Sequence, residues 1–245
     1  IRWVLFSSIA NGVSRAKNLL NSEDVHAALK AIKTLGIKYK LKKNICEIYG
    51  KGIKGYKYKK NLTINAENSG TLGRLLIGLL INTTEPIKLI GDKSLSKRDF
   101  RRISNPLSKF GAKFKLNNNK HLPLTIFGNP SLKGVHYEEK KGSAQCKSSV
   151  IFGAMRAKGY TFVKAKKSRN HTELLCKYLS LPITIQQKNK HDEIRIGEVK
   201  NLKPLNYNIP GDLSSAAFFV ALTVLANDSQ LTINKVVISK SDLII

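Results

Sequence analysis

Hydrophobic and polar positions follow one another along this chain in a pattern that occurs three times. The stretches 22–50, 94–128 and 168–197 each begin with a polar residue and continue with an amphipathic helix, a short strand, a turn rich in Lys and Asn, a second strand and a closing glycine. The pattern returns about every 70–78 residues, so each copy is a whole supersecondary unit. The repeat therefore predicts a domain assembled from three similar α/β units.

A second kind of helix precedes each of these stretches and is richer in small and apolar residues. A helix that is apolar on nearly all sides is usually a buried helix. Runs typical of strands follow at 85–92, 160–168 and 230–239. The order within a unit is therefore helix, strand, helix, strand, strand, with a further strand leading into the next buried helix. We expect the buried helices over 2–11, 71–82, 145–158 and 213–227.

Local signals at the ends of the amphipathic helices support the repeat. Ser22 is a good N-cap for the first of them, and Gly36 lies where a helix end needs a left-handed residue. In the second unit Gly111 ends the helix, whereas Pro106 within it is expected to bend or restart the helix. An apolar stripe at helical spacing is formed in the first unit by Val25, Ala28, Leu29, Ile32 and Leu35.

Composition is that of a soluble globular protein. Hydrophobic residues make up 42% of the chain, and the longest strongly apolar stretch, 216–226, is shorter than the roughly 20 residues that a spanning helix needs. The N-terminal residues lack the pattern of a signal peptide. Cys46, Cys146 and Cys176 have no metal-ligand spacing, and so sparse and odd a set indicates reduced thiols. We expect a cytoplasmic protein with no metal, no cofactor and no membrane partner.

The formal charge of +27 has two interpretations. One is nucleic-acid binding, and the other is a Lys-rich compositional bias combined with an anionic ligand. The densest basic stretch, 51–60, alternates Lys with Gly and Tyr and has the character of a polyanion site. Elsewhere the lysines are scattered over turns and helix backs, and a charged run is usually a solvated face. We favour the anionic ligand, and expect a monomer without a nucleic-acid partner.

Polar clusters open three of the predicted buried helices, at 68–71, 143–145 and 211–215. Free backbone N–H groups and the helix dipole make such helix starts suitable for anions, although plain capping explains most clusters of this kind. Lysine is the default cation of this chain, so an arginine is a candidate for forked binding of carboxylate or phosphate, the alternative being a structural ion pair. The candidate arginines are Arg2, Arg74 and Arg98.

Five segments carry a resemblance to a known family: NSGTLGRLL, GDKSLSKRDF, GSAQCKS, SRNHTELL and IPGDLSSAAFF. They resemble 3-phosphoshikimate 1-carboxyvinyltransferases (EPSP synthases), enolpyruvyl transferases of the shikimate pathway that leads to chorismate and the aromatic amino acids. The resemblance runs in order along essentially the whole chain. It implies an α/β (α+β) fold of the enolpyruvyl-transferase type, an inside-out α/β barrel of repeated βαβαββ units. Its ligands, shikimate 3-phosphate and phosphoenolpyruvate, would lie between two domains.

Residue roles follow from the resemblance where the motifs match. Shikimate 3-phosphate would be bound by Arg2, Ser143, Ala144, Gln145 and Ser168. Phosphoenolpyruvate would be bound by Gly70, Arg98 and Gln145. The Lys and Ser that precede the arginine in the family's N-terminal motif have no match here. Asp212 fits a P-G-D segment at the family's hinge, and we interpret it as a helix cap.

The resemblance also predicts how the chain is divided. We expect a nearly complete substrate-binding domain of three units over 1–208 and the start of a second domain over 209–245, with the chain incomplete at both ends. The acid and base residues of the family would lie beyond Ile245. The catalytic residues are therefore unassigned, and we expect the 245 residues to hold shikimate 3-phosphate weakly and without turnover.

Two other functions compete with this one. The UDP-N-acetylglucosamine enolpyruvyl transferases share the architecture, but they carry a reactive loop cysteine, and the corresponding region 93–98 has none. A basic RNA-binding protein is the alternative from another class. Tyr56 and Tyr58 among lysines have the composition of a base-stacking segment, although the stretch is short and lacks a known nucleic-acid fold signature.

Overall fold

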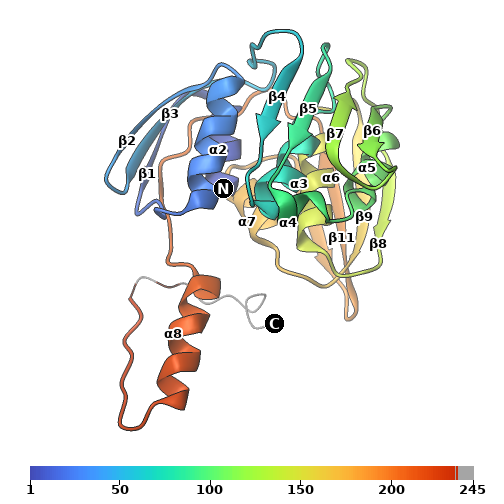
Figure 1. Ribbon diagram of the computed structural model, residues 1–245. Helices are drawn as coiled ribbons and strands as arrows, with labels where there is room; N and C mark the ends of the chain where they lie inside the picture. Colours follow the sequence, from blue (N-terminus) through green and yellow to red (C-terminus); the bar gives the residue numbers. More distant parts are fainter. Residues whose placement is uncertain (235, 237–245) are drawn as a thin grey trace.

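The computed structural model describes residues 1–234 and residue 236, and shows three four-stranded sheets arranged around buried helices (Figure 1). The helices are α1 (Arg2–Ser8), α2 (Glu23–Thr34), α3 (Gly70–Leu80), α4 (Lys93–Ser96), α5 (Arg101–Ser108), α6 (Ala144–Ala154), α7 (His171–Tyr178) and α8 (Leu213–Leu225). The strands are β1 (Asn11–Lys17), β2 (Lys38–Lys42), β3 (Ile45–Lys51), β4 (Leu62–Asn65), β5 (Ile87–Ile90), β6 (Lys113–Asn117), β7 (His121–Phe127), β8 (His136–Glu139), β9 (Tyr160–Lys166), β10 (Ile183–Gln187), β11 (His191–Gly197) and β12 (Tyr207–Asn208).

Each sheet combines one parallel strand pair with two antiparallel pairs. The strand orders are β12-β1-β3-β2, β4-β5-β7-β6 and β8-β9-β11-β10. The parallel pairs β4–β5 and β8–β9 enclose the crossover helices α3 and α6. In the first sheet the parallel partner of β1 is β12, where Ala16 lies opposite Tyr207. The βαβαββ order is thus confirmed in the second and third units, and β12 completes the first.

The helices α1, α3 and α6 form the centre of the core, as their apolar sequences predict. The rings of Phe6 and Phe152 pack α1 on α6 with centroids 4.9 Å apart. Gly78 of α3 faces the backbone of α6 so closely that an added Cβ would lie 2.2 Å from the carbonyl oxygen of Ser149. Only glycine permits this approach, so α3 and α6 are fixed side by side.

The predicted helix ends are confirmed in the first two units. The Ser22 side chain accepts a hydrogen bond from the N–H of Val25 at the start of α2. Gly36 and Gly111, which follow α2 and α5, have φ angles of +84° and +103°. Both lie in the left-handed region that favours glycine, which is why the helices stop there.

Three local expectations need correction. The first buried helix ends at Ser8, because the N–H of Asn11 donates to the carbonyl oxygen of Leu202 (2.8 Å) and Asn11 begins β1. Pro106 lies inside α5, which continues past it, and the break in this segment comes earlier, between α4 and α5. The strand expected at 230–239 is not formed over 230–234, and most of its remaining residues lie outside the described part of the chain.

Helix α8 extends away from the three sheets (Figure 1). Its side chains Phe218 and Leu225 are 76% and 83% exposed. The expectation that this fourth apolar helix is buried is therefore wrong, because the described elements leave its apolar side chains uncovered. Asp212 accepts a hydrogen bond from the hydroxyl of Ser215 in its first turn (2.7 Å). Among the residues that the structure describes, no helix has the length and apolar character to cross a membrane.

Candidate anion-binding site

The first turns of α3 and α6 are joined by side-chain hydrogen bonds. The amide nitrogen of Gln145 donates to the hydroxyl of Thr71 (2.9 Å), and its amide oxygen accepts from the guanidinium of Arg74. The hydroxyl of Ser149 also donates to the carbonyl oxygen of Arg74 (2.8 Å). These contacts place two helix N-termini, with their free N–H groups and positive dipole ends, at one edge of the domain.

Arg98 lies against the start of α3, where glycine makes room for it. A Cβ added to Gly70 would lie 2.8 Å from Nη1 of Arg98 and 3.8 Å from Nη1 of Arg74. The segment before Arg98 is fixed by Asp92, whose carboxylate accepts from the N–H of Leu95 (2.6 Å) at the start of α4. Gly70 and Arg98, predicted from separate motifs, are therefore neighbours.

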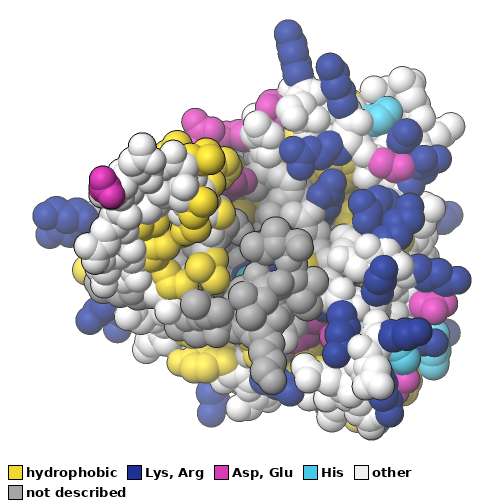
Figure 2. Space-filling model, turned by 90° about the horizontal axis from the view of Figure 1, so that it is seen from below, with side chains coloured by type: hydrophobic (Ala, Val, Ile, Leu, Met, Phe, Trp, Pro, Cys, Tyr) yellow, Lys and Arg dark blue, Asp and Glu magenta, His cyan; other side chains and the backbone are white. Residues whose placement is uncertain are grey.

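Positive charge accumulates around Arg74, Arg98 and Arg102 at this edge. Burial lowers the pKa of the Arg74 guanidinium, and the nearby charges of Arg98 and Arg102 lower it further, while Cys146 opposes the shift. In the described part of the chain none of these three arginines forms an ion pair. Figure 2, seen from below Figure 1, shows many Lys and Arg side chains scattered over the right-hand part of this end of the molecule. Such a cluster favours an anionic ligand.

The loop before α6 is held by one carboxylate and one glycine. Glu139 accepts hydrogen bonds from the backbone N–H groups of Ser143 (2.8 Å) and Lys141 (3.2 Å). The Ser143 hydroxyl in turn accepts from the N–H of Cys146 (3.3 Å) and caps α6, whose first residue is Ala144. Gly142 has a φ of +70°, and a Cβ there would lie 3.4 Å from the carbonyl oxygen of Lys167. The turn thus brings Ser143 close to the segment that carries Ser168.

Ser168 lies just before the start of α7, and Arg2 is the first residue of α1. The Ser168 hydroxyl is buried and has no hydrogen-bond partner among the described atoms. The guanidinium Nε of Arg2 donates to the hydroxyl of Thr172 (2.8 Å), which donates to the hydroxyl of Ser148 (2.7 Å). Burial lowers the pKa of Arg2 to about 10, with Glu173 opposing the shift and Arg169 adding to it. The start of α1 is thereby tied to α6 and α7.

A buried ion pair beneath the site was missed by the sequence reading. Nζ of Lys147 lies 2.6 Å from Oε1 of Glu173, and the two side chains are 0% and 1% exposed. The second oxygen of Glu173 has no hydrogen bond among the described atoms. A signal was available, because a Lys in a helix predicted to be buried needs a partner. Arg102, Ser148 and Thr172 were also missed, and their residue types alone carry no distinguishing signal.

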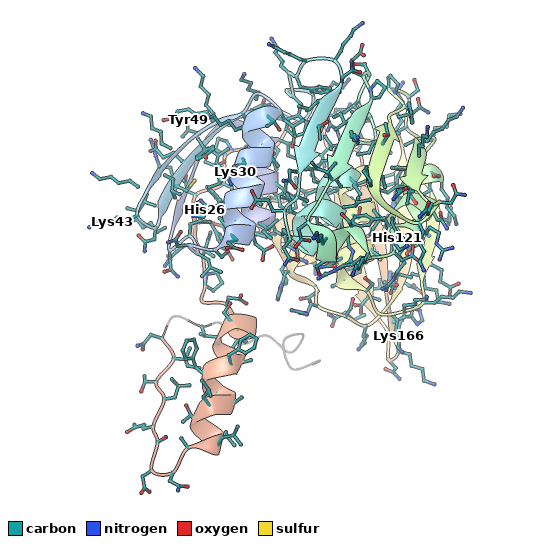
Figure 3. All side chains as sticks on the ribbon, in the orientation of Figure 1. His26, Lys30, Lys43, Tyr49, His121 and Lys166 are labelled. Atoms are coloured by element: carbon teal, nitrogen blue, oxygen red, sulfur yellow. The ribbon has the colours of Figure 1, made fainter. Side chains whose placement is uncertain are left out.

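Other candidates prove to be structural. The His26 ring forms a hydrogen bond with the side-chain oxygen of Asn21 (2.7 Å) and therefore has a structural contact near the start of α2 (Figure 3). The Tyr56 hydroxyl is hydrogen-bonded to Ser8 (2.7 Å), and Tyr58 packs against the core. The two tyrosines are therefore partly buried and held by the fold, which weakens the base-stacking argument for RNA binding but leaves the argument from net charge unchanged.

Repeated βαβαββ units, with arginines at the starts of their buried helices that have no ion-pair partner among the described residues, are the structural class that this chain represents. The model of the EPSP synthase (3-phosphoshikimate 1-carboxyvinyltransferase) family matches residues 1–245. The chain therefore belongs to the EPSP synthase family.

Named relatives and solved structures agree with this assignment. The 3-phosphoshikimate 1-carboxyvinyltransferase of Streptococcus mutans is 36% identical over 242 residues, which are 98% of this chain and 56% of the relative. That of Oenococcus oeni is 37% identical over 243 residues, which are 96% and 53%. The structure of EPSP synthase from Acinetobacter baumannii superposes with a TM-score of 0.81 at 32% identity, covering 91% of this chain and 49% of that one. The chain spans about half the length of the curated relatives that it matches.

Proposed function

We propose that this chain binds shikimate 3-phosphate and phosphoenolpyruvate at the edge where α1, α3 and α6 begin, as one half of an enolpyruvyl-transfer site. The observation that carries the proposal is the cluster of Arg74, Arg98 and Arg102, which has no carboxylate partner in the described part of the chain and is bridged by Gln145 to the start of α6. Both substrates are small polyanions, which fixed guanidinium groups and helix N-termini bind well.

Within this proposal each predicted residue has a physical role. Arg98 holds the phosphate or carboxylate of phosphoenolpyruvate, and Gly70 keeps the helix start open beside it. Gln145 touches both substrates because it already bridges α3 and α6. The backbone of Ala144, with the helix start that Ser143 caps, receives shikimate 3-phosphate. The buried hydroxyl of Ser168 and the guanidinium of Arg2 supply further hydrogen-bond donors to shikimate 3-phosphate.

The reaction that follows is addition and elimination. The 5-hydroxyl of shikimate 3-phosphate loses its proton to a base as its oxygen bonds to C2 of phosphoenolpyruvate, and the methylene carbon of phosphoenolpyruvate gains a proton from an acid. The tetrahedral intermediate then loses inorganic phosphate and a proton of the new methyl group, which forms the enolpyruvyl double bond. Arginines that contact the phosphate and carboxylate groups offset the negative charge as bonds change. Proton transfer requires positioned acid and base groups. We place these groups in the half of the relatives that these 245 residues do not span, and infer that the 245 residues alone bind without turnover.

The proposal also covers the domain organisation, the oligomeric state and the cellular compartment. We infer a substrate-binding domain over 1–208, since β12 completes the first sheet at Asn208, and the start of a second domain over 209–245, since α8 lies apart from the sheets. A monomer working in the cytoplasm is the setting we propose, and the three cysteines, all free and buried, are compatible with a reducing compartment.

The test is calorimetric titration of shikimate 3-phosphate into the 245-residue chain at low and moderate salt. Gln145→Ala should weaken binding of shikimate 3-phosphate by about tenfold, ~1.4 kcal/mol. Phosphoenolpyruvate is titrated in the same way, and Arg98→Lys should weaken its binding by a similar factor, because Lys lacks the guanidinium fork. Arg101→Lys is the matched control, since Arg101 is exposed and paired with Asp99 (2.8 Å). Equal losses in Arg98→Lys and Arg101→Lys would contradict the proposal.

A parallel titration separates the competing function. An RNA of arbitrary sequence should bind weakly, and its affinity should fall steeply with salt because counterion release drives it. RNA binding that survives moderate salt and is lost in Gln145→Ala would favour the RNA-binding alternative. A phosphate-release assay on the same protein completes the test, and turnover by these 245 residues would refute the division of the catalytic groups proposed above.

A further inference from the structure

A cavity of about 590 Å³ lies at the opposite end of the three buried helices. Its walls include Asn11, Asn82 and Arg156, each placed two or three residues beyond the C-terminal end of α1, α3 or α6. The three residues therefore occupy equivalent places in the three repeated units, and the cavity lies where the units meet. The segments 51–55 and 198–200 complete the walls.

The walls of this cavity are strongly basic. The lining includes four basic residues, Lys51, Lys54, Lys200 and Arg156, and a single acidic one, Glu198. The three lysines are exposed, and within the described residues none of them forms an ion pair. The negative ends of three helix dipoles oppose an anion here, but the effect falls off within the last turn. An anionic group held by the lysines at the rim avoids most of this opposition.

Arg156 is fixed by two hydrogen bonds that leave its Nε–H without a partner among the described atoms. Its Nη1 and Nη2 donate to the carbonyl oxygens of Leu79 and Ile53, so two of the carbonyl groups near the helix ends are already satisfied. The guanidinium also lies over the ring of Tyr56, 5.6 Å from its centroid. The remaining Nε–H is buried and has no partner among the described atoms.

Asn82 offers the complementary group. Its Oδ1 is likewise buried and has no hydrogen-bond donor among the described atoms. Buried polar atoms nearly always have a partner, and an unsatisfied pair in the walls of one cavity calls for a ligand with both functions. A hydroxyl group can donate to Oδ1 of Asn82, and an oxygen of the same ligand can accept from Nε of Arg156.

We propose that this cavity is a second ligand site, which binds a small phosphorylated metabolite carrying free hydroxyl groups. The phosphate lies among Lys51, Lys54 and Lys200 at the rim, and the hydroxyl groups reach Asn82 and Arg156 inside. The site is separate from the proposed substrate site, because the two lie at opposite ends of α1, α3 and α6. It does not depend on the function proposed above.

The test uses glycerol 3-phosphate as the probe and amide chemical shifts of the 245-residue chain as the readout. Binding at the cavity should shift the amides of Gly52, Gly55 and Val199. The double variant Lys54→Gln/Lys200→Gln should weaken binding at least tenfold. Lys113→Gln/Lys115→Gln on β6 is the matched control, because it removes the same charge from exposed strand positions outside the cavity.

Two comparisons define the chemistry. Inorganic phosphate should bind more weakly than glycerol 3-phosphate at the same amides, since it lacks the hydroxyl groups that reach Asn82. Arg98→Gln should leave the probe's affinity unchanged, which separates this site from the substrate site. Equal losses in the two lysine pairs, or shifts confined to the amides around Gly70 and Gln145, would overturn the proposal.

Discussion

The buried ion pair of Lys147 and Glu173 allows a sharp test of how the site is supported. Lys147→Met removes the ammonium and leaves the Glu173 carboxylate fully buried, with neither oxygen paired to a cation. Breaking a buried pair in this way costs about 3–5 kcal/mol of unfolding free energy, because the remaining charge cannot be solvated. Glu173→Leu should cost a similar amount for the reciprocal reason. Either loss is a large part of the stability of an ordinary domain.

The double variant separates a buried charge from a simple loss of packing. Lys147→Met/Glu173→Leu replaces both charges with apolar groups of similar size, and such replacements are often neutral or stabilising. We therefore expect its stability within about 1 kcal/mol of the parent, far from the sum of the two single losses. Arg15→Met, which breaks the exposed pair with Glu47 (2.8 Å), is the control and should have a much smaller effect.

Urea unfolding followed by tryptophan fluorescence measures these differences. Trp3 is the one tryptophan of the chain, is 3% exposed, and donates its indole N–H to the carbonyl oxygen of Leu205 (3.1 Å). Its emission therefore reports the opening of the core around α1, and an unchanged m-value would show that the surface exposed on unfolding is the same. Single variants that lose less than about 1 kcal/mol, or a double variant that loses the sum, would refute the reasoning.

Three further predictions concern the site and the core. Gly70→Ala should displace the Arg98 guanidinium and weaken phosphoenolpyruvate binding about tenfold (~1.4 kcal/mol) in calorimetry. Urea unfolding of this variant should show a stability that is unchanged or higher by up to about 1 kcal/mol, because alanine favours the helix. An unchanged affinity would contradict the contact between Gly70 and Arg98. Thr71→Val should weaken shikimate 3-phosphate binding by freeing the Gln145 amide, and Thr71→Ser should restore it. Burial raises the pKa of the Cys46 thiol to about 11, so a thiol reagent at mildly alkaline pH should label it only after unfolding; rapid labelling of the native protein would argue against the described core.

Much of the fold could be predicted because its signals are local. The stripe that includes Val25 and Leu29, the Ser22 cap and the left-handed Gly36 each depend on a few neighbouring residues. The pairing of β12 with β1 could not be predicted in this way. It joins Ala16 to Tyr207 through a strand of two residues, and nothing in a polar connector indicates which distant strand it will meet.

The candidate site was predictable to the extent that the fold repeats. The polar clusters in the first turns of α3 and α6 meet at one edge, as their equivalent places in the repeat predict, whereas the roles of Gly70 and Gln145 came from the family resemblance. Lys147 was not singled out from the sequence, because lysine is so common in this chain that one more lysine carries little signal by itself. Its importance comes from burial against Glu173, and this tertiary contact has no periodic signature. The apolar helix α8 shows the converse, since its composition predicts burial that the described elements do not provide.

The most direct test of the central claim is an amide chemical-shift titration of the 245-residue chain with shikimate 3-phosphate. If the starts of α1, α3 and α6 form one anion-binding edge, the saturable shifts will cluster at Gly70, Ser143, Gln145 and Ser168. Shifts absent from these residues, or spread evenly over exposed lysines without saturation, would contradict the account.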